Sequence, residues 1–281
     1  MLEPMRIEFK KMHGLGNDFI VLDAPPPSAW TPDPALISAL ADRHTGIGFD
    51  QALLIEPPRT PGTRAFYRIF NADGSEVEQC GNGVRCVAAL LYSRDPAAGR
   101  EFQLDSPGGR IGARIGEDGL VSVDMGVPDF APASLPFSAP AESSVYPLSV
   151  NDRELDIGAV SMGNPHAVLQ VPDIGTAPVE RLGPAIEHHP RFPRRTNVGF
   201  MQIVDRGHIR LRVHERGAGE TRACGTGACA AVAVGRRHGL LDENVEVSLK
   251  GGTVMVSWAG GSAHLWLTGP AARVYEGTID L

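Results

Sequence analysis

The stretch Cys80-Gly81-Asn82-Gly83 returns 144 residues later as Cys224-Gly225-Thr226-Gly227. Apolar residues follow each copy: Val84 and Val87 lie at helical spacing after the first, and the apolar run Ala228–Val234 after the second begins a predicted helix that extends to His238. In each copy the glycines therefore lead into the first turn of a predicted helix. Two equivalent helix starts, each preceded by a cysteine, predict a duplicated fold.

Three further blocks match between the two halves, in the same order and at nearly the same offset. They pair Gly16–Leu22 with Gly163–Leu169, Ile47–Gln51 with Val198–Gln202, and Gly108, Gly109 and Gly126 with Gly251, Gly252 and Gly269. One such match can arise by chance. Four in order, at offsets of 143 to 151 residues, indicate an internal duplication.

The secondary structure predicted around these blocks also repeats. Apolar and polar side chains alternate in Met5–Lys10 and again in Ile209–His214, which is the period of a half-buried strand. A helix is predicted to open at Thr31–Asp33 and to close at Gly46, and its counterpart begins near Val179 and stops near Pro190. Further strands are predicted at 102–104, 120–125, 245–249, 254–258 and 264–267.

These elements predict an α+β fold. We expect two pseudo-symmetric lobes, each a mostly antiparallel sheet around a central helix, with the active site in the cleft between them. The N-terminal lobe is expected to span residues 1–125 and the C-terminal lobe residues 126–270, which leaves the tail 271–281 to return to one of them. The stretch Ala131–Pro147, rich in Ala, Pro and Ser, is predicted to be a linker or a surface loop.

The composition restricts the class of protein. With 281 residues, 42% of them hydrophobic and 21% charged, the chain is typical of a soluble globular protein rather than a disordered one. A net charge of −7 disfavours binding to nucleic acid or to an anionic membrane. The apolar runs Cys86–Tyr92 and Ala228–Val234 are far shorter than the ~20 residues of a transmembrane helix, and the N-terminus lacks a signal-peptide core. We therefore expect a cytoplasmic protein whose four cysteines are thiols.

The position of Cys80 and Cys224 before helix starts bears on their chemistry. Unpaired N–H groups and the helix dipole favour an anion there, so we expect a lowered thiol pKa. The glycines leave the backbone open to a substrate carboxylate. Facing thiols on equivalent lobes suit the removal of a proton from one face of a carbon and its return to the other. The predicted reaction is racemisation or epimerisation, with the two thiols titrating as a coupled pair.

The residue nine positions before each cysteine differs between the halves. Asn71 precedes Cys80, whereas Glu215 precedes Cys224 and has Arg216 beside it. A guanidinium suits a carboxylate, and a glutamate suits an ammonium group. These residues therefore favour a zwitterionic amino acid as the substrate.

Other uses of the cysteines fit the pattern less well. The spacings from Cys80 to Cys86 and from Cys224 to Cys229 are not those of a tight C-x-x-C zinc pair, so we expect no metal. Cys86 and Cys229 fall on apolar helical stripes and are expected in the core. A G-x-G-x-x-A match at Gly225–Ala230 lacks the alternating strand–helix–strand context of a dinucleotide site.

A cofactor is not expected either. Pyridoxal phosphate requires a Schiff-base lysine, and the three lysines, Lys10, Lys11 and Lys250, fall on a strand or in a hairpin turn. His166 lies inside a repeated block, so a structural and a functional role remain open for it.

Together, the motifs resemble those of the diaminopimelate epimerase family. The matching stretches are Phe9–Phe19, Gly48–Gln51, Phe70–Ser75, Cys80–Cys86, Gly163–His166, Thr196–Val198, Glu215–Gly217 and Cys224–Gly227. The resemblance covers nearly the whole chain, and no motif position departs from it.

The resemblance implies an enzyme that interconverts L,L- and meso-diaminopimelate without cofactor or metal, on the route to lysine and peptidoglycan. Cys80 and Cys224 would be the acid–base pair, with His166 and Glu215 tuning the thiols. The substrate-binding residues it implies are Asn17, Gln51, Asn71, Gly81, Asn82, Asn164, Asn197, Glu215, Arg216, Gly225 and Thr226. It also implies a homodimer of two-lobed subunits in which the C-terminal tail packs onto the first lobe.

Three alternatives stay open. A proline racemase or hydroxyproline epimerase of the same fold would keep both cysteines and replace the asparagine-rich part of the site. An isomerase that resembles PhzF would lack the cysteine pair. A non-enzymatic module that binds amino acids would need the helix-start glycines but not a thiol at each.

Overall fold

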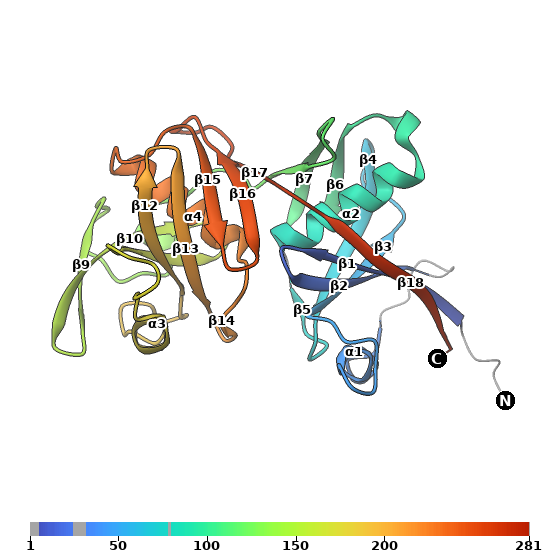
Figure 1. Ribbon diagram of the computed structural model, residues 1–281, viewed down its shortest axis with the longest axis horizontal. Helices are drawn as coiled ribbons and strands as arrows, with labels where there is room; N and C mark the ends of the chain where they lie inside the picture. Colours follow the sequence, from blue (N-terminus) through green and yellow to red (C-terminus); the bar gives the residue numbers. More distant parts are fainter. Residues whose placement is uncertain (1–5, 25–31, 78–79, 281) are drawn as a thin grey trace. The chain divides into compact units, whose positions relative to one another are not determined.

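The computed structural model describes residues 6–24, 32–77 and 80–280 (Figure 1). The chain divides into two compact units, unit 1 with Met1–Val123 and Gly269–Leu281, and unit 2 with Asp124–Thr268. Each unit holds one mostly antiparallel sheet and one long buried helix, which confirms the predicted α+β class. No helix within the described residues combines the length and hydropathy that a transmembrane span needs.

Unit 1 contains a sheet in which the strands lie side by side in the order β18, β1, β2, β3, β4, β6, β7 and β8. The short strand β5 also pairs with β4. Only the β2–β3 and β4–β6 pairs of these are parallel. The strands are β1 (Arg6–Gly14), β2 (Asn17–Asp23), β3 (Gln51–Glu56), β4 (Thr63–Asn71), β5 (Glu76–Val77), β6 (Glu101–Ser106), β7 (Gly109–Ile115), β8 (Val121–Asp124) and β18 (Ala272–Asp280). The helices are α1 (Pro34–Ala41), α2 (Gly81–Arg94) and the 3-10 turn η1 (Pro96–Ala98).

Unit 2 repeats this plan. Its neighbouring strands are β9, β10, β11, β12, β13, β15, β16 and β17, with β14 paired to β13, and only β11–β12 and β13–β15 are parallel. The strands are β9 (Tyr146–Val150), β10 (Arg153–Ser161), β11 (Pro165–Gln170), β12 (Asn197–Asp205), β13 (His208–Glu215), β14 (Gly219–Glu220), β15 (Asn244–Leu249), β16 (Gly252–Ser257) and β17 (Trp266–Gly269). The helices are α3 (Val179–Glu187), α4 (Gly225–Arg237) and the 3-10 turn η2 (Pro132–Ser134).

The C-terminal strand β18 completes the first sheet. It pairs antiparallel with β1 from Arg6 opposite Asp280 to His13 opposite Ala272, and it takes the place that β9 takes beside β10 in unit 2. Arg6 and Asp280 also form an ion pair at 2.7 Å. The tail after the second repeat is thus a structural part of unit 1.

The two long helices are largely buried against strands of their own units. Helix α4 contacts β10, β11, β12, β13 and β16, and all of its residues from Gly227 to Gly235 are buried. Glycine, alanine and valine dominate that stretch, and small side chains let surrounding strands approach on every side. At Gly158 in β10, an added Cβ would lie only 2.3 Å from Cγ1 of Val234. This contact fixes the position of α4 near its C-terminal end.

Helix α1 differs from its predicted extent. It ends at Ala41 rather than near Gly46, because the Asp42 carboxylate accepts hydrogen bonds from the backbone N–H groups of His44 and Thr45, at 2.8 and 2.7 Å, and turns the chain. Asp33 caps the start of α1, whereas the predicted opening residue Thr31 lies outside the described residues, as does Met5 of the first predicted strand.

The stretch Ala131–Pro147 is only partly the surface loop that its composition predicts. It contains η2 and the start of β9, and Leu135 and Phe137 are buried in the core of unit 2. Two apolar side chains therefore anchor this otherwise irregular segment. The strand predicted at 264–267 begins two residues later, at Trp266.

The packing of β10 on α4 predicts the effect of one added methyl group. Gly158→Ala should lower the free energy of unfolding by about 1–3 kcal/mol, because the new Cβ overlaps Val234. Gly199→Ala, also on a buried strand, is the control, since its Cβ would meet Leu211 at an ordinary 3.5 Å. Urea unfolding followed by circular dichroism measures both. Equal midpoints for the two variants would contradict the close approach at Gly158.

Candidate active site

The predicted site residues of unit 1 gather at one end of its sheet. Asn17 begins β2, Gln51 begins β3 and Asn71 ends β4, and the strand register places Gln51 directly opposite Asn71. Cys80 is the N-cap residue of α2, and its side chain makes no capping hydrogen bond. The first-turn residues Gly81 and Asn82 are buried.

Hydrogen bonds connect three of these residues. The Oδ1 atom of Asn17 accepts from Sγ of Cys80 at 3.8 Å and from Nδ2 of Asn82 at 3.2 Å. The Nδ2 atom of Asn17 donates to Oδ2 of Asp50 at 2.9 Å, and Oδ1 of Asn82 accepts from Nη2 of Arg85 at 2.7 Å. The chain of contacts thus runs from a carboxylate to a guanidinium.

The two end groups of this series of hydrogen bonds, Asp50 and Arg85, determine how the side-chain amides of Asn17 and Asn82 are oriented. A carboxylate only accepts and a guanidinium only donates. Asp50 therefore requires the NH₂ group of Asn17, and Arg85 requires the carbonyl oxygen of Asn82. Both amides satisfy these requirements only when the Asn17 oxygen points toward Asn82 and Cys80. Cys80 is consequently the S–H donor in this arrangement.

The other two polar residues of unit 1 form a second group. Nε2 of Gln51 donates to Oδ1 of Asn71 at 2.9 Å, and Nδ2 of Asn71 donates to Oγ of Ser75 at 3.1 Å. The Oε1 atom of Gln51 is buried and accepts no hydrogen bond from the described residues. A buried acceptor without a partner is costly, and a bound donor such as an ammonium group relieves that cost.

Unit 2 places its site residues at the equivalent end of its sheet. Asn164 directly precedes β11, Asn197 begins β12 and Glu215 ends β13. Cys224 is the N-cap residue of α4, so that Gly225 and Thr226 form the first turn of this helix. The duplication therefore repeats the position of the site as well as the sheet.

The Cys224 thiol donates a hydrogen bond to the side-chain carboxylate of Glu215. Its Sγ donates to Oε2 of Glu215 at 3.1 Å, and Oε1 of Glu215 accepts from Oγ1 of Thr221 at 2.5 Å. Burial raises the pKa of Cys224 well above its usual value, and the charge and the hydrogen bond of Glu215 raise it further. Thr226 and Gly227 act in the opposite direction with smaller effect. The lowered pKa predicted from the helix start is thus wrong for Cys224.

His166 is buried and neutral. It is 1% exposed, and burial, followed by the charge of Arg216, lowers its pKa to about 3. Its Nε2 lies 3.0 Å from Oδ1 of Asn164, so the neutral ring donates there. Nδ2 of Asn164 donates to Oγ1 of Thr226 at 3.4 Å, and this hydroxyl lies 3.6 Å from Sγ of Cys224. Through Asn164 and Thr226, His166 orients groups beside the thiol.

Asn197 and Arg216 contact each other through the backbone. Oδ1 of the buried Asn197 accepts from the backbone N–H of Arg216 at 3.0 Å, and its Nδ2 donates to the carbonyl oxygen of Pro165 at 3.0 Å. Asn197 thus fixes the chain at Arg216. The Arg216 side chain is exposed, and its Nη1 donates to the carbonyl oxygen of Arg194 at 3.2 Å.

Several supporting residues are not among those the sequence motifs single out. Asp50 and Arg85 lie inside the matching stretches, so their position was a usable signal. The partner of Asp50 is Asn17, 33 residues away, whereas Arg85 binds Asn82 within the first turns of the same helix. Thr221 and Glu187 lie in no repeated block and carry no such signal.

One ion pair is duplicated together with the site. Arg68 binds Glu76 at 2.7 Å in unit 1, and Arg212 binds Glu220 at 2.6 Å in unit 2. The hydrogen bond from Arg212, together with Lys250, lowers the pKa of Glu220 to about 2 against the effect of burial. Each pair joins the strand before the cysteine to the segment that leads to it.

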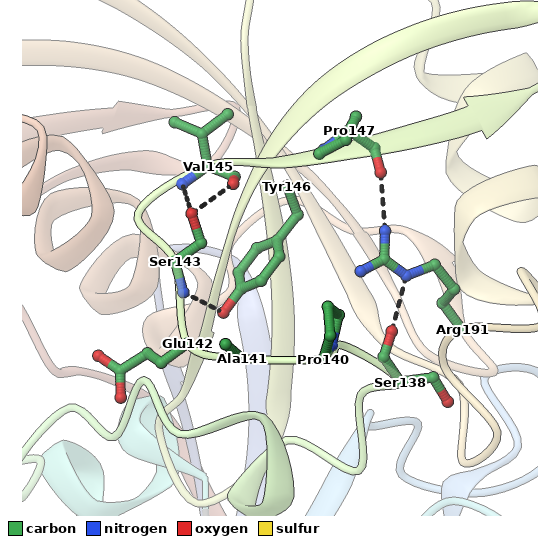
Figure 2. Close-up of a pocket in the computed structure, with 9 residues that line it drawn as sticks. All are labelled: Ser138, Pro140, Ala141, Glu142, Ser143, Val145, Tyr146, Pro147 and Arg191. Carbon is green, nitrogen blue, oxygen red and sulfur yellow. Dashed lines mark hydrogen bonds between the residues drawn. The ribbon is translucent and has the colours of Figure 1, made fainter.

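A cavity of about 620 Å³ in unit 2 has a different lining. Its residues are Ser138, Pro140, Ala141, Glu142, Ser143, Val145, Tyr146, Pro147 and Arg191. In Figure 2 the Arg191 guanidinium bridges the carbonyl oxygens of Ser138 and Pro147, at 2.8 and 2.7 Å, and the Tyr146 hydroxyl accepts from the backbone N–H of Ser143. Its polar groups thus stabilise the loop itself, and none of the predicted site residues lines it.

Metal ligands do not cluster in the described part of the chain. No group of three or more His, Cys, Asp or Glu side chains there is arranged to hold a metal ion. The chemistry that the described groups offer is proton transfer by thiols and recognition by amides and charges.

The buried His166 predicts a pH dependence of stability. The unfolded chain binds a proton near pH 6.5 but the native chain only near pH 3, so stability is lost as the pH falls below 6.5. From pH 7 to pH 5 the free energy of unfolding should fall by about 2 kcal/mol more in the wild type than in His166→Gln. Urea unfolding at both pH values measures this difference.

His44→Gln is the control for this experiment, because His44 is exposed and should leave the pH dependence as in the wild type. If His166→Gln and wild type lose the same stability between pH 7 and pH 5, His166 is not held neutral by burial.

The sequence is similar to one known protein family over most of its length. The family model described as diaminopimelate epimerase matches residues 9–131 and 158–274. A curated diaminopimelate epimerase of Nitrosomonas europaea is 57% identical over 277 residues, which cover 99% of this chain and 100% of that protein. The enzyme of the same name from Stutzerimonas stutzeri is 52% identical, with the same coverage.

Solved structures share the fold at much lower identity. A hydroxyproline epimerase from Agrobacterium vitis has a TM-score of 0.70 and 17% identity, covering 98% of this chain and 93% of that one. A PhzF-family protein from Bacillus anthracis has the same TM-score and identity, covering 99% and 100%. These likenesses show the fold alone. The family match and the curated relatives, together with the paired cysteine-led helix starts, show that the chain belongs to the diaminopimelate epimerase family.

Proposed function

We propose that this chain interconverts L,L- and meso-diaminopimelate with Cys224 and Cys80 as the acid–base pair. Its family makes it an isomerase that acts as a diaminopimelate epimerase. The observation that supports the two-thiol mechanism best is the hydrogen bond from Sγ of Cys224 to the Glu215 carboxylate, at the start of a buried helix. A thiol beside a base is able to become the thiolate that abstracts a proton.

Each step of the proposed reaction moves one proton. Glu215 accepts the proton of Cys224, and the resulting thiolate takes the proton from the α-carbon of the substrate. Cys80, which Asn17 holds as an S–H donor, returns a proton to the opposite face of the same carbon. The configuration at that carbon is inverted, and the reverse reaction exchanges the roles of the two thiols. This mechanism requires both sulfur atoms to reach one α-carbon.

Charge develops on the substrate carboxylate while the proton is away from the carbon. In the proposal, the N–H groups at Gly81 and Asn82 and at Gly225 and Thr226 stabilise that charge, because the first N–H groups of a helix lack intrahelical acceptors. Neutral His166 contributes orientation rather than charge, since its ring donates to Asn164.

Diaminopimelate has two amino-acid ends, so the site needs donors and acceptors beyond those at the reacting carbon. Arg216 supplies a guanidinium for a carboxylate. The Oε1 atom of Gln51 supplies an acceptor for an ammonium group, and Asn71 fixes the orientation of this side chain. Asn17, Asn82, Asn164 and Asn197 add neutral hydrogen-bonding groups that distinguish the substrate from apolar amino acids.

We also propose that two copies of the chain form a homodimer through β18. This strand of nine residues pairs with β1 and with no other strand among the described residues. Val274 and Tyr275 on it are 57% and 45% exposed. A long edge strand with exposed apolar side chains is unusual in a monomer, and an identical strand from a second copy covers it symmetrically.

The cytoplasm is the compartment we propose. None of the four cysteines forms a disulfide in the structure, and the mechanism needs two of them as thiols. A reducing compartment keeps thiols in that state.

Deuterium exchange tests the reaction. Wild-type protein incubated with L,L-diaminopimelate in heavy water, with EDTA and no added cofactor, should produce the meso isomer carrying deuterium at the α-carbon. Cys80→Ala and Cys224→Ala should each slow the interconversion by about 100- to 10,000-fold, because each removes one acid–base group. Cys86→Ala and Cys229→Ala are matched controls at buried cysteines and should retain activity. Chiral chromatography with mass spectrometry measures both products.

Two outcomes would contradict the proposal. Interconversion at the wild-type rate in both single variants would exclude the two-thiol mechanism. Activity on proline or hydroxyproline, with none on diaminopimelate, would assign the site to a different substrate.

Analytical ultracentrifugation tests the dimer. The wild type should sediment with twice the monomer mass of 29.9 kDa. Val274→Asp should shift the protein to monomer, because it places a charge on the covered edge strand. Val204→Asp, at an apolar residue that is 45% exposed in unit 2, is the control and should stay dimeric. A monomeric wild type, or a dimeric Val274→Asp variant, would be inconsistent with an interface at β18.

A further inference from the structure

We propose that Glu187 is a positioning residue for the active site, because its buried carboxylate holds both ends of the turn that carries Glu215 and Arg216. The inference rests on the proposed function, in which Glu215 activates a thiol and Arg216 binds a carboxylate. Glu187 lies in none of the repeated blocks, and its role follows from the geometry of unit 2 alone.

The two carboxylate oxygens of Glu187 bind the residues on either side of the dipeptide Glu215-Arg216. Oε2 accepts from Nε2 of His214 at 2.8 Å, and Oε1 accepts from the backbone N–H of Gly217 at 2.9 Å. His214 directly precedes Glu215, and Gly217 directly follows Arg216. A single side chain at the end of α3 thus fixes the chain on both sides of the two site residues.

Burial makes this contact strong. Glu187 is 3% exposed and His214 is 7% exposed. Burial opposes the charged form of Glu187, yet the hydrogen bonds from His214 and Gly217 outweigh it and hold the pKa of the carboxyl below its usual value. Arg195 lies 3.7 Å from Oε1 and His188 3.9 Å from Oε2. A buried, ionised carboxylate that accepts two hydrogen bonds resists displacement, because moving it would leave its charge and both donors without partners.

Helix α3 is shaped to bring Glu187 to this place. At Gly183, one turn before Glu187, an added Cβ would lie 2.6 Å from Cγ of His214. The helix therefore rests directly on the His214 ring. Gly217 has φ of +76°, a conformation that suits glycine and directs its N–H toward Glu187.

The remaining sides of the turn are held by other elements. Asn197 of β12 accepts from the backbone N–H of Arg216, and Thr221 donates to the Glu215 carboxylate. Glu187 is the group that ties α3 to the same turn. Without it, the distance of 3.1 Å between Glu215 and the Cys224 sulfur is no longer supported from that side.

The test compares three variants at Glu187. Glu187→Met keeps the approximate volume and removes both acceptors, and it should lower kcat/KM for diaminopimelate by about 100-fold through misplacement of Glu215 and Arg216. Because Arg216 binds substrate in the proposal, KM should rise as well as kcat fall. Glu187→Gln should recover activity to within about 10-fold of wild type, since its amide accepts from Gly217 and donates to the other tautomer of His214.

A second readout does not depend on catalysis. The rate of iodoacetamide labelling at Cys224 follows its thiolate fraction, which the charge of ionised Glu215 keeps low until Glu215 itself accepts the proton. In Glu187→Met this rate should rise several-fold, with labelling at Cys80 in unit 1 unchanged. Cys229, buried in the same helix, reports general loosening and should stay unlabelled. Peptide mass spectrometry measures all three sites in one sample.

Glu180→Met is the matched control, because it makes the same change on an exposed position of α3 and should leave both readouts as in the wild type. If Glu187→Met fails to fold, Glu187→Asp replaces it. The shorter side chain keeps the charge but cannot reach both donors, and the same changes are expected at about 10-fold or more.

The outcomes separate this inference from the proposed function. A folded Glu187→Met or Glu187→Asp variant with wild-type kcat/KM and wild-type labelling of Cys224 would overturn the positioning role. Labelling of Cys229 together with Cys224 would also overturn it, because the effect would then be general destabilisation. A wild type without diaminopimelate activity would refute the proposed function, while the labelling experiment would still decide whether Glu187 positions Glu215.

Discussion

The hydrogen bond between Cys224 and Glu215 is the interaction on which the site of unit 2 depends. A thiol that is 4% exposed does not ionise by itself, because the low-dielectric surroundings penalise the thiolate. Glu215 adds its own charge to that penalty, yet in the proposed mechanism it is also the acceptor to which the proton moves. Cys224 and Glu215 therefore share one proton. The hydrogen bonds of Thr221, Glu187 and Asn197 hold Glu215 and the residues next to it, and so support the hydrogen-bond distance to Cys224.

Duplication supplies two helix starts, and a few substitutions make them chemically different. The position of Glu215 in unit 2 is occupied by Asn71 in unit 1, which binds Gln51 rather than the thiol. The acceptor for Cys80 comes instead from the Asn17 amide, whose orientation Asp50 and the buried Arg85 determine. One thiol thus faces a base and the other a neutral carbonyl oxygen. The proposed reaction needs one sulfur as thiolate and the other as thiol at any moment, and the two roles are exchanged in the reverse direction.

The pKa of Cys224 is raised, and not lowered as its position at a helix start predicts, because burial has a larger effect than the helix N-terminus. A helix N-terminus stabilises an anion by about 0.3–1 kcal/mol at an exposed position. Full burial can shift a pKa by up to about 3–5 units, at about 1.4 kcal/mol per unit, so burial dominates. Helix α4 is enclosed by five strands, and the sequence pattern of small residues predicts a buried helix but not how deeply its first residue lies.

The sequence by itself determined the duplication, the α+β class, both cysteine-led helix starts and the family. These follow from local spacing and from repeated blocks, because a period of side chains directly specifies a strand or a helix. Only the tertiary structure decided the protonation states of Cys224 and His166, the amide orientations beside Cys80, and the hydrogen-bond partners of Arg85 and Glu187. Some of the hydrogen-bond partners are close in sequence, such as Asn82 and Arg85, and others are distant, such as Glu187 and Gly217. In every case the burial, which sets the pKa values, exists only after folding has brought separate strands and helices together.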